Sequence, residues 1–195
     1  MKTIQGLLVL FTFLFLALLG CSDQLQSPVA PAEQSSLDKV TITEFTFTNS
    51  PEPFTENPYN YMKIVGRTLH MKDYPVTDIV IATDPRVNGR MEHILSLKLD
   101  IVTGEGPCHG SFKLYPDPDV TNGGYWEGTY QGYRFKTNDP YIFVLPLKLV
   151  AHGRGGTIDG MKGFMDANLN VYTNPDYYPL PIYWTGEGTG VLKEH

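Results

Sequence analysis

Hydrophobic and polar residues alternate along most of the chain from residue 40 onwards, which is the pattern of strands with one buried face. In residues 95–101 the odd positions are Leu, Leu, Leu and Ile, and the even positions are Ser, Lys and Asp. No stretch repeats apolar residues with the period of a long helix. The pattern predicts nine strands, at residues 40–48, 61–71, 78–83, 90–103, 107–115, 124–136, 141–152, 164–173 and 182–193.

The strand predicted at residues 124–136 indicates how the strands are arranged. One face carries Trp126, Gly128, Tyr130 and Gly132, and the other carries Glu127, Thr129 and Gln131. Alternating large and small residues suit the interior of a small closed barrel, where the glycines leave room for bulk from across the barrel. Sequential strands joined by short turns pair antiparallel. We therefore predict an all-β fold, a single antiparallel β-barrel of about eight to nine strands, with a two-sheet sandwich as the alternative.

Three irregularities are expected in these strands. The apolar positions change phase between Ile42 and Phe45, which predicts a bulge or a curved first strand. Gly66 lies in the middle of the strand predicted at residues 61–71. Pro146 lies inside the strand at 141–152 and favours an edge position or a bulge, because proline has no N–H for the ladder.

The chain begins with a targeting signal. In residues 1–20, Lys2 precedes an apolar run that is short for a membrane span and typical of a secretory signal peptide. The run ends in Leu-Leu-Gly-Cys, which resembles the lipobox of bacterial lipoproteins. That resemblance implies cleavage after Gly20 and acylation of Cys21, with chains such as palmitate anchoring the protein in a membrane. An ordinary signal peptide is the alternative.

Residues 21–38 are polar, contain two prolines and have no apolar period, so we predict a lipidated, disordered tether before a barrel domain at 39–195. About 17 such residues reach roughly 20–25 Å. The expected location is the bacterial cell envelope. Ser22 after the lipidated cysteine favours the outer membrane or cell surface over the inner membrane.

Composition and charge narrow the classes of function that are expected. A chain with 42% hydrophobic and 18% charged residues folds rather than staying disordered. The net charge of −6 without a basic cluster argues against nucleic acid as a partner. The five histidines show no metal-ligand spacing, so neither a metal nor a cofactor is expected. Cys108 has no disulfide partner once Cys21 is lipidated, and we interpret it as a small buried hydrophobe.

The runs GPCHGSFKL, GYWEGTYQGY, GRGGTIDGMKG and WTGEGTGVL, within residues 90–192, resemble small glycine-rich barrels of the allene-oxide-cyclase and dirigent type. The resemblance implies a barrel fold. It includes no diagnostic motif, so no cyclase active-site residue is carried over. Residues 124–126 also match the Gly-x-Trp of lipocalins and avidin-like barrels, where this motif marks the first strand instead.

Aromatic residues gather in the C-terminal half and could line an apolar pocket with polar tips, as small-ligand sites do. The candidate pocket residues are Trp126, Tyr130, His109, His152 and Trp184. A filled core without a cavity is the alternative. Glu127 and Glu187 alternate with inward residues and are expected to face solvent, and no catalytic residue is assigned.

These features predict a lipid-anchored envelope protein that binds a small apolar ligand or an envelope partner. The alternative is an isomerase-like or cyclase-like enzyme with its site in the barrel mouth. An enzyme of that kind needs a titratable group in a desolvated cavity. Convergence of His109, His152, Arg154 or Asp159 on an open cavity would favour it.

Overall fold

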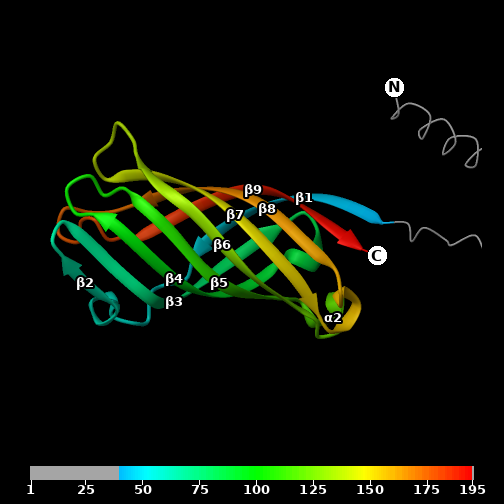
Figure 1. The fold of residues 1–195 in the computed structure, drawn as a ribbon. Coiled ribbons are helices and arrows are strands. Elements are labelled where there is room, and N and C mark those ends of the chain that lie inside the picture. Colours follow the sequence, from blue (N-terminus) through cyan, green and yellow to red (C-terminus); the bar gives the residue numbers. More distant parts are fainter. Residues whose placement is uncertain (1–39, 195) are drawn as a thin grey trace, which may run out of the picture. The chain divides into compact units, whose positions relative to one another are not determined.

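The structure is a computed structural model that describes residues 40–194, and in this range the chain forms a closed antiparallel β-barrel (Figure 1). The expected signal peptide, the lipidated Cys21 and the tether lie outside the described residues.

Nine strands form one sheet. They are β1 (Thr41–Pro51), β2 (Met62–Val65), β3 (Thr68–Ala82), β4 (Gly89–Asp100), β5 (Gly106–Pro116), β6 (Tyr125–Lys136), β7 (Ile142–Arg154), β8 (Lys162–Tyr172) and β9 (Tyr183–Glu194). Their order in the sheet is β1-β9-β8-β7-β6-β5-β4-β3-β2, and a further pairing between β1 and β3 closes eight of them into the barrel. The all-β barrel predicted from the sequence is thereby confirmed, and the two-sheet sandwich is excluded.

Four short helical turns connect the strands. They are η1 (Pro58–Tyr61), η2 (Pro85–Val87), α2 (Pro118–Thr121) and η3 (Gly156–Ile158). The last three lie at one end of the barrel, where α2 contacts both η2 and η3. Trp126 supports this end, because its indole Nε1 donates to the carbonyl oxygen of Arg86 at 2.7 Å.

Alternation along each strand builds the core, since successive side chains point to opposite faces of a sheet. In β7 every second residue from Phe143 to Gly153 is buried, and most of the residues between are exposed. In β6 Trp126 and Tyr130 are buried inside the barrel, as predicted. Glu127 and Glu187 lie on the outer face, also as predicted.

Inward-facing glycines make room for aromatic rings from the neighbouring strand. Phe45 of β1 lies opposite Gly190 of β9, and Phe112 of β5 lies opposite Gly128 of β6. A Cβ atom on Gly190 would lie 2.4 Å from Cζ of Phe45, which is too close for any real contact. The predicted alternation of large and small residues is therefore present, but the rings that use the space belong to the adjacent strand rather than to the far wall.

The bulge that was one of two alternatives for the first strand is absent. β1 keeps one register with β9 from Thr41 to Asn49, so it has no bulge there, and Ile42 lies exposed on the outer face. The irregularity occurs in β3 instead. The register of β3 against β4 shifts between Met71 and Tyr74.

The strand predicted at residues 61–71 is a hairpin. Gly66 adopts a left-handed φ of 60° in the turn between β2 and β3, a conformation that glycine reaches without strain. β3 then continues past residue 71 to Ala82 and includes all but the last residue of the strand predicted at residues 78–83. Pro146 lies in the interior of the sheet rather than at an edge. The pairing of β6 with β7 is interrupted between Gly132 and Phe135, but the register is the same on both sides, so the expected bulge is also absent.

Candidate functional site in the barrel

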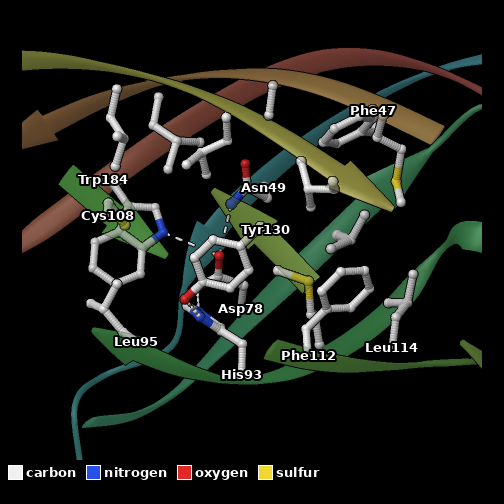
Figure 2. Close-up of a pocket in the computed structure, with 18 of the residues that line it drawn as sticks. Phe47, Asn49, Asp78, His93, Leu95, Cys108, Phe112, Leu114, Tyr130 and Trp184 are labelled. Carbon is white, nitrogen blue, oxygen red and sulfur yellow. Dashed lines mark hydrogen bonds and ion pairs between the residues drawn. The ribbon is translucent and has the colours of Figure 1, made fainter. Parts of the chain in front are cut away.

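The barrel encloses a cavity of about 70 Å³. Every one of the eight barrel strands contributes to its wall, which is mostly apolar (Figure 2). A water molecule takes up about 30 Å³ in the liquid, and an engineered apolar cavity of about 150 Å³ holds benzene. The cavity is therefore large enough for a few atoms of a small ligand. Met91 and Met165 line it and have flexible side chains that can adjust to an occupant.

A buried carboxylate lies in the wall of this cavity. Asp78 of β3 is 1% exposed. Its Oδ2 accepts hydrogen bonds from Nδ2 of Asn49 at 2.7 Å and from Nε1 of Trp184 at 3.1 Å. These donors come from β1 and β9, so barrel closure brings three strands together at one carboxyl group (Figure 2).

His93 connects Asp78 to Tyr130. The hydroxyl of Tyr130 donates to the carbonyl oxygen of Ile94 at 3.2 Å and lies 2.9 Å from Nδ1 of His93. The second contact is a hydrogen bond whose donor depends on the tautomer of His93. Burial raises the pKa of the Tyr130 hydroxyl well above its usual range, which keeps it neutral.

The opposite ring nitrogen of His93 faces the carboxyl group. Nε2 lies 3.5 Å from Oδ1 of Asp78, which is longer than a good hydrogen bond. Neither atom has a close hydrogen-bond partner, and the same holds for Oδ1 of Asn49. Buried polar atoms are normally satisfied, so these three form a buried polar patch without partners at the cavity wall.

Arg134 supplies a second polar group to the cavity wall. It is 1% exposed, its Nη1 donates to the carbonyl oxygen of Pro179 at 2.8 Å, and its guanidinium lies 3.8 Å from the ring centre of Phe143. Burial lowers the pKa of Arg134 to about 10, so the side chain is still a cation at neutral pH.

The thiol of Cys108 is not a nucleophile in this setting. Cys108 is free and buried, as predicted from the sequence. Burial raises its pKa to about 12, so almost none of it is the reactive thiolate at neutral pH.

Two of the predicted pocket residues, Tyr130 and Trp184, line the cavity. Trp126 is buried but is not part of the cavity wall. The prediction for His109 and His152 needs correction, because both lie exposed on the outer face. The neighbouring residues Cys108 and Ala151 point inward, and alternation therefore turns both histidines outward.

The groups named as indicators of an enzyme do not converge. Nε of Arg154 binds Oε1 of Glu127 at 2.8 Å on the outer surface. Asp159 is exposed and accepts a hydrogen bond from the backbone of Gly155. Neither Arg154 nor Asp159 lines the cavity.

The polar groups of the cavity were missed from the sequence. They are Asn49, Asp78, His93 and Arg134. The alternation of inward and outward positions along each strand was the signal that could have identified them. His93 shares its face of β4 with Met91 and Leu95, and Arg134 extends the face of β6 that holds Trp126 and Tyr130.

The fold and its site define a closed eight-stranded antiparallel barrel with an apolar cavity and a few buried polar groups. Comparisons with protein-family models, with curated proteins and with solved structures give no match. Within residues 40–194 no group of three His, Cys, Asp or Glu side chains is placed to hold a metal ion. No helix in the described range is long and apolar enough to cross a membrane.

Proposed function

We propose that the barrel binds a small, largely apolar ligand in its interior and that lipid on Cys21 holds the chain in the bacterial cell envelope. The observation that carries the first part is the cavity of about 70 Å³, whose apolar wall contains a few buried polar atoms without partners. Small-molecule sites have this composition, with apolar surface for affinity and few polar groups for orientation. An interior cavity favours a small ligand over an envelope partner.

Xenon is a suitable probe, because dry apolar cavities bind it. Binding to the full chain is measured by xenon NMR and by the rise in Tm under xenon. Ala167→Leu places three more carbons in the cavity wall and should abolish binding. Val150→Leu, on the outer face of β7, should leave binding unchanged. Absence of binding to the wild-type chain, or equal binding by Ala167→Leu, would contradict the proposal.

The lipid anchor is supported by the lipobox-like run that ends at Cys21. Cys21→Ala should move the full chain from the membrane fraction to the soluble fraction and remove incorporation of labelled fatty acid. A variant that stays with membranes while carrying no lipid label would show that the anchor lies elsewhere.

An isomerase-like enzyme is the second candidate. The observation that favours it is the pair of His93 and Asp78, which line the cavity with Nε2 of His93 3.5 Å from Oδ1 of Asp78. Such a pair can take a proton from one carbon and return it to another.

Hydrogen–deuterium exchange of butanone in D₂O tests this chemistry. A base in the cavity would accelerate the exchange of the protons next to the carbonyl group for deuterium. His93→Gln should remove the acceleration. His109→Gln, which changes a histidine on the outer face, should retain it. Exchange no faster than in buffer alone would argue against an enzyme and leave ligand binding in place.

A further inference from the structure

The buried guanidinium of Arg134 has one edge in use and one edge without a partner. Nη1 is bound to the carbonyl oxygen of Pro179. Nε and Nη2 have no hydrogen-bond partner among the described residues. These two nitrogens lie on the same side of the planar group, and together they form the fork that matches the two oxygens of a carboxylate.

Two other arginines of the chain bind a carboxylate through the same edge of the guanidinium. Arg86 uses Nε and Nη2 to bind both oxygens of Asp84, at 3.0 Å and 2.7 Å. Arg67 uses the same two nitrogens on Asp100, at 2.8 Å and 3.3 Å. Arg134 presents the same pair of nitrogens inside the barrel, and no carboxylate of residues 40–194 lies within 4.0 Å of it.

The two buried carboxylates of the described range accept hydrogen bonds from other side chains. Asp84 is paired with Arg86, and Asp78 is bound by Asn49 and Trp184 with His93 nearby. The ring of Phe143 gives the Arg134 cation partial compensation. A buried charge without a counterion is costly to a fold, so an anion that enters from outside would bind strongly here.

Arg134 lies in the cavity wall, four residues beyond Tyr130 on the same face of β6. At about 3.3 Å per residue the two are roughly 13 Å apart along the strand. Most of the remaining wall is apolar, and the cavity volume admits only a short chain. We propose that the ligand is a short aliphatic monocarboxylate, with its carboxylate on Nε and Nη2 of Arg134 and its hydrocarbon chain in the cavity. This inference rests on the proposed ligand-binding function.

Calorimetric titration of the full chain with butyrate and with 1-butanol tests the inference, because the two probes share a chain and differ in the head group. Butyrate should bind at least about tenfold more tightly than 1-butanol to the wild type, given the strength of charge-assisted hydrogen bonds. Arg134→Met should lose that preference and still bind 1-butanol. Arg154→Met removes the same charge from the outer surface and should keep the preference.

Arg134→Lys is a second variant that retains the positive charge and lacks the fork. It should show a reduced preference for butyrate over 1-butanol. It replaces Arg134→Met as the test variant if Arg134→Met fails to fold. Inorganic phosphate should neither bind more tightly than butyrate nor displace it. Tighter binding of phosphate would overturn the assignment to a carboxylate.

The outcomes separate the two proposals. Equal binding of butyrate and 1-butanol to the wild type, or a preference for butyrate that survives in both Arg134 variants, would overturn the role of Arg134 and leave the cavity as a site for apolar ligands. Failure of butyrate, 1-butanol and xenon alike to bind would overturn the ligand-binding function itself.

Discussion

Buried charged side chains in this barrel differ in whether the chain provides them with a partner. Asp84 is hydrogen-bonded by a residue close to it in the sequence. Its carboxylate caps η2 by accepting from the backbone N–H of Arg86 at 2.9 Å, and it also binds the guanidinium of the same residue through both oxygens. The carbonyl oxygen of Arg86 in turn accepts from Trp126. Arg134 has no such local partner, and this contrast is the basis for assigning it to a ligand.

The first prediction concerns stability in acid. Hydrogen bonds from the Arg86 side chain lower the pKa of Asp84 below its ordinary value of 3.8, although burial opposes the shift. Ionised Asp84 therefore stabilises the fold above about pH 4, and this stabilisation is lost as the pH falls through the folded-state pKa. Urea unfolding between pH 7 and pH 2 should show a shallower acid loss for Asp84→Asn than for the wild type.

At pH 7 the same substitution should cost about 1 kcal/mol, since part of this ion pair is screened by solvent. Asp166→Asn is the matched control, because Asp166 is exposed on the outer face of β8. It should keep the acid profile of the wild type. Parallel profiles for Asp84→Asn and the wild type would show that the cap contributes nothing to acid stability.

At the scale of the element, β6 shows most directly how a strand divides inside from outside. Trp126, Tyr130 and Arg134 project inward from it, while Glu127 reaches Arg154 on the outer surface. The three inward residues have different tasks. Trp126 closes one end, Tyr130 binds His93, and Arg134 offers the free edge of its guanidinium.

The second prediction compares neighbours on this strand. Trp126 is 1% exposed, so Trp126→Ala should cost about 3–5 kcal/mol, a large share of the 5–15 kcal/mol typical of a folded domain. Glu127→Ala loses only an exposed ion pair and should cost less than about 0.5 kcal/mol. Denaturant unfolding of both variants measures the difference. A larger loss for Glu127→Ala would mean that the strand is inside out.

For the molecule as a whole, closure of the barrel depends on its first strand. β1 pairs with β9 over Thr41–Asn49 and with β3 over Phe47–Pro51, so it joins the last strand to the third. This closure also brings Asn49, Asp78 and Trp184 together. Loss of β1 would therefore open the barrel and dismantle the polar patch at once.

The third prediction concerns the segment before β1. Residues 22–38 have no core-forming pattern, so their removal should change the Tm by less than about 2 °C, which corresponds to under about 1 kcal/mol. A longer deletion to residue 45 removes the start of β1 and the buried ring of Phe45, and it should lower the Tm by many degrees. A similar large fall for the shorter deletion would show that residues 22–38 pack on the barrel.

Local alternation was sufficient to predict most of the strands and the direction of many side chains. Successive residues of a strand point to opposite faces whatever the strand pairs with, and the sequence therefore predicted that Trp126 is buried and that Glu127 and Glu187 face outward. It did not predict the hairpin at Gly66, and it allowed for a bulge in β1 that is absent. One glycine or one change of phase fits a turn, a bulge or an unbroken strand, and pairing with neighbours selects among them.

The cavity and its polar groups were decided only by the tertiary structure. Asp78 meets Trp184, 106 residues further along, because β1 and β9 close the barrel beside β3. The volume left inside depends on how the side chains of all eight strands fill the space together, which no single strand reveals. Whether Arg134 has a partner depends on which carboxylates the pairing register brings near it. Alternation along the sequence determines which way a side chain points, and the closed register of the barrel determines what it meets.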